Sequence, residues 1–320
     1  MPRPTTITAK LAHLQKLAAD PGEQAAYALD LLATERSVRL LDAALSALER
    51  APDESLTPAA HGALRELYER LDRNGPRHDA GGSLRAAIAR LLQRLARPAD
   101  ADILERAALT FEFQPPGREE VASALRATAL AALSALDEEL AASYAVRLLV
   151  DAHTNPMSGE PALTAARVLA TQGQTLPLFE YALGTQDQPE VLSECLRAQT
   201  RLPAPLLADL VDRYVDATDE LALVGLFDLL FEHPEGEVHT QRLATFLAET
   251  RLYGAYRYLC TVVAGRRHAA LIPALIALAD CEEDPNKWAP LAEALSLLDG
   301  DRRADAALSR LRRRMALSRH

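Results

Sequence analysis

The chain has 320 residues, a formal net charge of −10, 49% hydrophobic residues and 25% charged residues. This is the composition of a folded globular protein, and it excludes wholesale disorder. The charge is uneven, because residues 301–320 hold seven Arg against two Asp, so residues 1–300 carry −15. A body this acidic repels nucleic acid and anionic lipid on average, and any such contact has to be local.

Strong helix formers dominate the chain. Only 14 residues are Gly, and the segments are rich in Ala and Leu, which have high helix propensity. No segment is predicted to be a strand, and we expect an all-α fold. The first helices are expected over residues 8–20, 22–33, 36–49, 58–73, 83–95 and 98–110. Thr57 and Pro58 are typical of an N-cap and a first helical turn.

Two irregular stretches interrupt these helices, and both are candidate sub-boundaries. Residues 74–82 (NGPRHDAGG) contain three Gly and one Pro and look like the most flexible connection. Residues 111–117 (FEFQPPG) contain paired prolines, which forbid a helix. Phe111 and Phe113 either pack back onto the helices or form a brief extended piece.

The second half of the chain is the more regular. Helices are expected over residues 118–136, 138–152, 161–170, 176–183, 189–201, 205–215, 219–231, 238–249, 253–264, 269–279, 287–298 and 303–316. Those that start near Val191, Leu221, Tyr253 and Trp288 play the same part in successive helix-turn-helix units, at steps of 30, 32 and 35 residues. Such a period is typical of stacked α-hairpins that bury their apolar faces against their neighbours.

Three short segments resemble a known repeat family. Residues 37–45 (SVRLLDAAL) place Val and Arg before an Ala-Ala-Leu run, and residues 187–191 (DQPEV) and 284–288 (DPNKW) resemble an Asp-Pro turn. In these features the chain resembles the HEAT-repeat family of armadillo-like α-solenoids. The resemblance implies one domain over residues 1–320, a right-handed superhelix of about nine antiparallel helix pairs, most regular over residues 160–320. It also implies binding of an extended partner on a concave surface.

Several classes of site and location are not indicated. The chain has no phosphate-binding glycine loop, no HExxH and no GxSxG motif, so neither an enzyme nor a cofactor is predicted. Cys195, Cys260 and Cys281 form no CxxC pair, and we expect them to be buried free thiols rather than metal ligands.

The N-terminus lacks the apolar segment of a signal peptide, and no apolar run is long enough to span a bilayer. A cytoplasmic, soluble protein is therefore expected. Its three Lys among 35 basic residues, with abundant Ala, are typical of a GC-rich bacterial genome.

The strongest candidate binding segment is residues 251–268 (RLYGAYRYLCTVVAGRRH), here called the Arg/Tyr segment, with four Arg, three Tyr and no acid. Arg with Tyr can grip phosphate, stack on bases or anchor a protein interface. The candidate binding residues are Arg251, Tyr253, Tyr256, Arg257, Arg266 and Arg267. The alternative is that Tyr256 or Tyr258 fills the core and Arg266–Arg267 complement a helix C-terminus.

Two further segments allow two interpretations each. In residues 151–160 (DAHTNPMSGE), His153 among carboxylates is a candidate general base or metal ligand, or else the segment is an Asn-Pro turn that caps the next helix. The basic helix at residues 303–316 has an Arg-rich outer face, which is either solvated or a docking site for an acidic partner.

These observations give a leading functional hypothesis and two alternatives. The leading one is a non-catalytic scaffold that binds a protein partner of unknown identity. The runner-up is nucleic-acid binding, as in HEAT-like alkylbase glycosylases, through the Arg/Tyr segment and the basic C-terminal helix. The third is an enzyme of the HEAT-like type that acts on tetrapyrroles, for which no residue of this chain provides a match.

Overall fold

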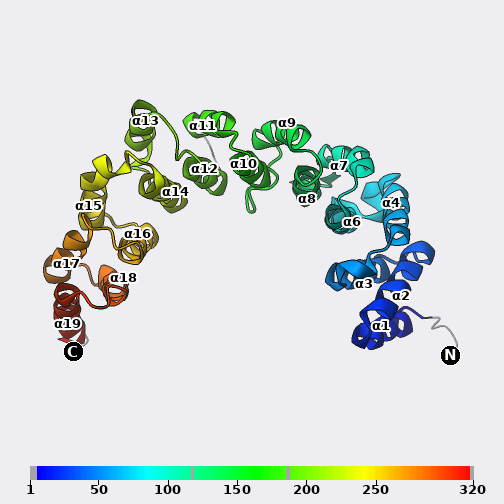
Figure 1. Ribbon diagram of the computed structural model, residues 1–320, viewed down its shortest axis with the longest axis horizontal. Helices are drawn as coiled ribbons and strands as arrows, with labels where there is room; N and C mark the ends of the chain where they lie inside the picture. Colours follow the sequence, from blue (N-terminus) through cyan, green and yellow to red (C-terminus); the bar gives the residue numbers. More distant parts are fainter. Residues whose placement is uncertain (1–5, 117–118, 185–187, 318–320) are drawn as a thin grey trace. The chain divides into compact units, whose positions relative to one another are not determined.

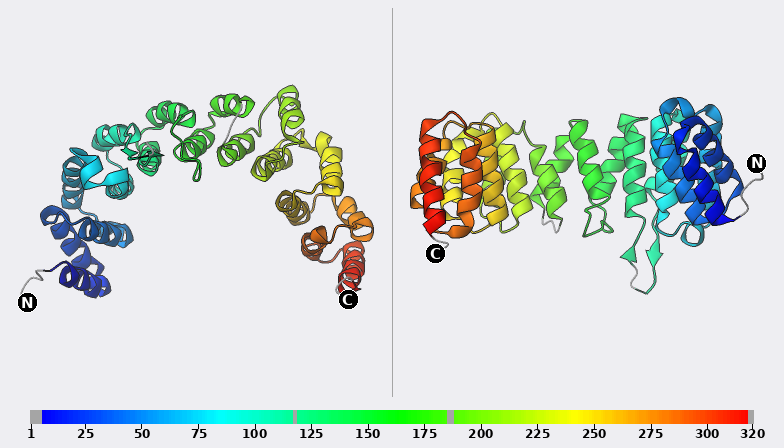
Figure 2. Two further views of the ribbon diagram at one scale, coloured as in Figure 1. Left: turned by 180° about the vertical axis from the view of Figure 1, so that it is seen from behind. Right: turned by 90° about the horizontal axis from the view of Figure 1, so that it is seen from below.

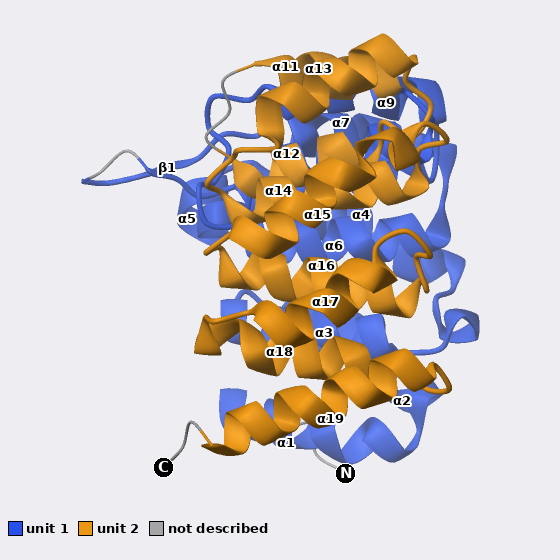
Figure 3. Ribbon diagram, turned by 90° about the vertical axis from the view of Figure 1, so that its left-hand side faces the viewer, with its two compact units in different colours: residues 1–174 blue, residues 175–320 orange. Residues whose placement is uncertain are grey.

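The computed structural model describes residues 6–116, 119–184 and 188–317. These residues form nineteen α-helices, several short 3-10 turns and a single two-stranded ladder (Figure 1). The prediction of an all-α chain is thus confirmed, except that the ladder is a strand pair where none was expected. The chain divides into two compact units, residues 1–174 and residues 175–320 (Figure 3). Both candidate sub-boundaries, 74–82 and 111–117, lie inside unit 1.

Unit 1 contains ten helices and the two strands in its described part. Their bounds are α1 (Ile7–Lys16), α2 (Pro21–Thr34), α3 (Val38–Arg50), α4 (Pro58–Asp72), α5 (Gly75–His78), α6 (Ser83–Leu95), α7 (Ala101–Ala108), β1 (Phe113–Gln114), β2 (Glu119–Glu120), α8 (Ser123–Ser134), α9 (Glu138–Leu149) and α10 (Ala162–Thr171). The strands pair antiparallel, with Phe113 opposite Glu120.

The helices of unit 1 lie in two rows. Helices α3, α6, α8 and α10 follow one another in contact, and α2, α4, α7 and α9 pack on their other side (Figure 1). Ala44, Ala129 and Ala132 are fully buried between them, and side chains this small let helix axes approach closely. Capping follows the sequence pattern: the Thr57 side chain accepts a hydrogen bond from the Ala60 backbone N–H, as predicted for this N-cap.

Two predicted elements of unit 1 need correction. The helix expected to begin at residue 118 begins at Ser123, because residues 119–120 pair as β2 and the Glu120 carboxylate accepts a hydrogen bond from the Ala122 N–H just before the helix. The stretch 74–82, expected to be flexible, instead forms α5 and a 3-10 turn around the buried Asp79. A charged side chain that is buried and bonded orders this stretch despite its glycines.

Unit 2 contains nine helices in its described part. Their bounds are α11 (Thr175–Leu183), α12 (Pro189–Arg197), α13 (Ala204–Tyr214), α14 (Glu220–Glu232), α15 (Thr240–Glu249), α16 (Tyr253–Gly265), α17 (Ile272–Cys281), α18 (Pro285–Ser296) and α19 (Arg302–Leu317). Asp187, in one of the two turns that resemble the HEAT family, lies outside the described residues.

The repeat expected from the sequence corresponds to one row of unit 2. Helices α12, α14, α16 and α18, whose starts were predicted near Val191, Leu221, Tyr253 and Trp288, pack on one another in that order, and α19 packs on α17 and α18 (Figure 1). Helices α12 and α14 approach closely, because a Cβ built on Gly225 would lie 2.6 Å from the Ser193 Cα.

The cysteines follow the prediction only in part. Cys195 and Cys260 are buried in unit 2, and burial raises the pKa of the Cys260 thiol to about 12. Cys281 is exposed at the end of α17, so the expectation that all three are buried is wrong for this residue. Within the described ranges, no helix combines the length and apolar character needed to cross a membrane.

Candidate functional site

Three loops of unit 1 meet at one edge of the helix rows. They lead into α6, α8 and α10 and comprise residues 73–82, 109–122 and 150–161. Because these three helices run side by side and each is entered from the same edge, the loops project together, the β1–β2 ladder farthest (Figure 2). The edge therefore joins the two segments that sequence analysis considered separately, 111–117 and 151–160.

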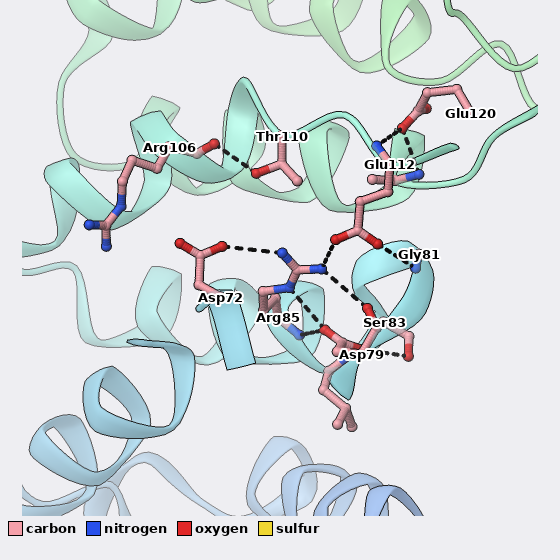
Figure 4. A network of polar contacts seen from close by, with 11 residues as sticks. Asp72, Asp79, Gly81, Ser83, Arg85, Arg106, Thr110, Glu112 and Glu120 are labelled. Carbon is pink, nitrogen blue, oxygen red and sulfur yellow. Dashed lines mark hydrogen bonds and ion pairs between the residues drawn. The ribbon is translucent and has the colours of Figure 1, made fainter. Parts of the chain in front are cut away.

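A buried arginine ties the first two loops together (Figure 4). Arg85, in the first turn of α6, donates from Nε to the Asp79 carboxylate at 3.1 Å and from Nη1 to Asp72 at 3.2 Å, and its Nη2 pairs with Glu112 of the next loop. Asp79 also accepts hydrogen bonds from the N–H groups of Leu84 and Arg85 at 2.9 Å, so it caps α6.

A second arginine, in the next helix of the same row, has the same arrangement of partners. Arg126 of α8 donates from Nη2 to Glu120 at 2.7 Å and to the His153 carbonyl at 3.2 Å, and it forms an ion pair with Asp151. Each arginine thus binds a carboxylate six residues before it and another in the following loop. The two arginines and these four carboxylates are all nearly inaccessible to solvent.

This network is costly to bury. Removing charged groups from water carries a penalty that pairing offsets only when every group is well bonded, so such a network is weak evidence for stability. Burial would lower the pKa of Arg85, but the hydrogen bond and charge of Glu112, together with those of Asp79, raise it above its ordinary value. Arg85 therefore stays charged, and its fork fixes the positions of two successive loops.

Above the network lies an exposed set of rings, here called the aromatic cluster: Phe111, Phe113 and His153. Phe111 and Phe113 are 43% and 48% exposed, and they flank the buried Glu112, as an extended chain places alternate side chains on opposite sides. The His153 ring meets the two phenyl rings edge to face, at 5.6 Å and 5.2 Å between centroids. The two phenyl rings are thus held against a ring from the next loop.

Exposed apolar side chains are concentrated around this cluster. Within the described residues, six of the fifteen exposed large hydrophobic side chains lie between Leu109 and Met157, although this segment is a small part of the chain. Val150 is 70% exposed and Met157 is 90% exposed, in the same loop as His153. A gathering of exposed apolar side chains is typical of an interaction surface.

Loop 151–160 matches the turn interpretation. The Asn155 side chain accepts hydrogen bonds from the N–H groups of Met157 and Ser158, and Glu160 accepts one from Thr164 near the start of α10. No group of three or more His, Cys, Asp or Glu residues suited to a metal ion occurs in the part of the chain that the structure describes. His153 contributes its ring to the aromatic cluster instead.

The Arg/Tyr segment is largely neutralised by neighbouring helices. Arg257 pairs with Glu293 at 2.7 Å, and the Tyr253 hydroxyl donates to Asp284 at 2.8 Å. Tyr256 is fully buried, so it fills the core and takes no part in a binding surface. The segment is therefore far less positive than its own sequence suggests.

The two arginines at the end of the segment bind to α14 and to the loop after α18. Arg266 pairs with Glu232 at the C-terminus of α14, and Arg267 donates to the Asp299 carbonyl at 3.1 Å. Arg251 forms no hydrogen bond or ion pair with another described residue, but it lines a cavity of about 430 Å³ together with Tyr253 and several carboxylate side chains. Its surroundings are acidic.

Comparisons with known proteins assign no family. No family model matches the chain, and no curated protein matches it. Among solved structures, a crystal structure described as an engineered protein from the Northeast Structural Genomics Consortium matches with 15% identity and a TM-score of 0.40, covering 96% of this chain and 99% of that chain. A likeness at this level carries no argument about fold or function.

Proposed function

We propose that this protein is a non-catalytic scaffold that binds another protein through the aromatic cluster of unit 1. In this proposal the helices belong to a HEAT-like, right-handed solenoid of about nine antiparallel pairs, which serves as the frame for the binding surface. One observation carries the proposal: Phe111 and Phe113 stay half-exposed, although a buried network fixes the loop between and below them.

The chemistry of the cluster favours a protein partner. Aromatic rings and Met are the side chains that protein interfaces favour, and they supply contact area at a low cost in conformational entropy. The predicted partner segment presents aliphatic side chains to Phe111, Phe113 and Met157. This location refines the expectation from the sequence, which placed the partner along a concave face of the helices.

The free-energy cost of burying the charged network supports a binding role. Because apolar residues of similar volume often stabilise a fold as well as buried ion pairs do, a buried network that is retained suggests a need for position rather than for stability. Arg85 and Arg126 supply that position, since Glu112 and Asp151 each stand within two residues of a cluster ring.

Site-specific photo-crosslinking tests the proposal. A benzoyl-phenylalanine in place of Phe113 is compared in vivo with the same residue in place of Leu176, which is 69% exposed in unit 2. We expect a defined crosslinked protein from position 113, resistant to nuclease, and none of that size from position 176. The partner is then identified by mass spectrometry, and its binding is measured with purified components.

A pair of surface variants completes the test. Phe111→Ser with Phe113→Ser is expected to weaken binding of the identified partner at least tenfold, whereas Leu176→Ser leaves it unchanged. Leu176→Ser should change the free energy of unfolding by less than about 1 kcal/mol, because exposed side chains away from special features contribute little. The double variant also removes ring contacts with His153 and Arg126, each worth about 0.5–1.5 kcal/mol, so urea unfolding must show that it is still folded under the binding conditions. Equal crosslinking from both positions, or a crosslink to nucleic acid that nuclease removes, would overturn the proposal.

A further inference from the structure

Two helices that lie in different units carry nearly the same sequence. Residues 39–50 of α3 (RLLDAALSALER) and residues 302–313 of α19 (RRADAALSRLRR) are identical at eight of twelve positions. Four matched pairs of positions are buried in both helices: Leu41 and Ala304, Ala44 and Ala307, Leu45 and Leu308, and Leu48 and Leu311. Helix α3 also buries Leu40 and Ala47, where α19 has the exposed Arg303 and Arg310.

The outward side of the pattern is also shared. Arg302, Ala306, Ser309 and Arg313 follow one another at i, i+4, i+7 and i+11, which places them on one helix face. Arg39, Ala43, Ser46 and Arg50 occupy the same places in α3. We call each of these two sets an arginine face: a pair of arginines about 16 Å apart, from eleven residues at 1.5 Å each, with two small residues between.

The arginines of both faces lack partners among the described residues, as Arg312 of α19 also does. Arg39, Arg50, Arg302 and Arg313 are exposed, and none forms a hydrogen bond or ion pair with any residue that the structure describes. By contrast, Arg310 on the flank of α19 forms two hydrogen bonds with Asp280, at 2.7 Å and 2.9 Å.

Other arginines of α19 form hydrogen bonds or ion pairs with neighbouring residues. Arg314 donates to the carbonyls of Ala279 and Asp280 at the end of α17, and Arg303 pairs with Asp301. At the end of α3, Arg90 and Arg94 of α6 pair with Glu49 and with Asp53 of the following turn. The four outward arginines, in contrast, have no neighbouring carboxylate from the described ranges paired with them.

We propose that each arginine face binds an acidic helix of a partner protein. The small residues between the arginines let a second helix lie close, at an axial separation of about 8–10 Å. Two carboxylates eleven residues apart on that helix would meet the two arginines, and charge complementarity fixes its register. Because the pattern occurs once in each unit, the protein offers two sites for the same kind of helix. The face on α19 is the more open, because Ala306 and Ser309 are exposed whereas Ala43 and Ser46 are half-buried.

The surroundings favour a helix over a nucleic-acid strand. Asp42 and Asp305 stand at matching places beside the two faces, and they repel a continuous line of phosphates but accept a basic residue between two acidic ones. The Arg314 guanidinium covers one face of the Trp288 ring near α19, at 5.1 Å, so this face does not stack on a base.

A stapled helical peptide tests the proposal. The probe is a fluorescein-labelled helix of about seventeen residues with Glu at positions eleven apart, one Lys between them and Ala or Ser along the same face. Anisotropy titrations at low salt, about 0.05 M, are expected to show two sites per chain. The scrambled peptide of the same composition should bind at least tenfold more weakly.

Charge reversal then assigns the sites. Arg302→Glu with Arg313→Glu, and separately Arg39→Glu with Arg50→Glu, should each reduce the number of sites from two to one, and the fourfold variant should bind none. The matched control is Arg73→Glu with Arg201→Glu, which changes the net charge equally at two other exposed arginines. Circular dichroism confirms that each variant is folded.

Three results would each overturn the inference. They are equal binding of the scrambled peptide, unchanged binding by the fourfold variant, and preferential binding of single-stranded DNA that the same variants abolish. The result does not depend on the aromatic cluster, because Phe111→Ser with Phe113→Ser should leave binding of the acidic peptide unchanged. Failure of one proposal is therefore distinguishable from failure of the other.

Discussion

The guanidinium carbon of Arg126 lies 4.4 Å from the centroid of the Phe111 ring. One side chain therefore belongs both to the buried charge network and to the exposed aromatic cluster. The contact couples them physically, because a cation over a ring face is attracted by the ring quadrupole and holds the ring in place. Substitutions in the buried network should thus change the position of the Phe111 ring at the surface.

Removal of the Arg126 charge should destabilise unit 1. Arg126→Met leaves the Glu120 and Asp151 carboxylates buried without their cation, and the expected loss is about 3–5 kcal/mol in the free energy of unfolding. Urea unfolding followed by circular dichroism measures it. Arg126→Met combined with Glu120→Gln should recover part of the loss, and a double variant as unstable as the single one would contradict this account.

The close approach of α12 and α14 predicts opposite effects for two glycine substitutions. In Gly225→Ala the new Cβ would lie 2.6 Å from the Ser193 Cα and carbonyl oxygen, so the helices must move apart, at a cost of about 1–3 kcal/mol. Gly62→Ala in α4 meets nothing within 4 Å and should stabilise by up to about 1 kcal/mol through helix propensity. Thermal unfolding of both variants checks the difference in sign.

The arginine at the end of α6 should not be replaceable by lysine. Arg94 donates to the carbonyls of Leu48, Glu49 and Ala51 at the end of α3, at 2.8–3.1 Å. The Leu48 carbonyl also accepts the Ala51 N–H at 3.1 Å, so Arg94 adds bonds chiefly to the Glu49 and Ala51 carbonyls. A lysine ammonium lacks the planar fork that reaches these carbonyls together, so Arg94→Lys should cost about 1–2 kcal/mol. The control is Arg312→Lys, an exposed arginine without a partner among the described residues, and it should be neutral in the same chemical unfolding experiment.

The stability of unit 2 should depend on pH through His239. Burial, and then the nearby Arg242 charge, lower the pKa of His239 below its ordinary value. The folded state consequently binds fewer protons than the unfolded state, and stability falls as the pH drops through the unfolded value of about 6.5. In His239→Gln the decrease in unfolding free energy between pH 8 and pH 5.5 should be smaller than in the parent chain. A pH dependence identical in both proteins would contradict the assignment.

The helices were largely predictable because their signals are local. Apolar spacing and N-caps such as Thr57 act within one or two turns, so the sequence alone predicts α4 and most other helices within a few residues. The start of α8 was missed because it depends on a pairing between Phe113 and Glu120 across a turn. The order of stretch 74–82 was missed because it depends on Arg85 and Glu112, which lie outside it.

The candidate site was harder to predict because its contacts join different repeats. Nothing in the sequence near a charged residue early in a helix shows that its side chain is buried. The burial of Arg85 and Arg126 therefore could not be predicted. Likewise, the charge of the Arg/Tyr segment was misjudged because Glu293 and Glu232 lie more than thirty residues from the arginines that they pair with. The spacing of such pairs by about one repeat is the signal that could have revealed them.

The preference for arginine over lysine illustrates the same point. Arg70, Arg94 and Arg314 each donate to carbonyls at the end of a neighbouring helix, 32 to 46 residues away in sequence. These contacts use the planar fork of the guanidinium, which lysine lacks. Composition alone suggested a genomic origin for this bias, whereas the structure gives many of these arginines a mechanical use as caps between repeats.

Arg85 and Arg126 also govern how unit 1 can come apart. Each is shared between two successive repeats, so the carboxylate that belongs to the following loop loses its cation when the arginine's own helix unfolds. Opening α8 removes the cation that Glu120 and Asp151 share, and opening the loop after α7 takes Glu112 away from Arg85. Unit 1 should therefore lose its hydrogen-exchange protection across α6, α7 and α8 as one block rather than fraying helix by helix, and a truncation placed between α6 and α8 would yield an insoluble fragment rather than a smaller domain.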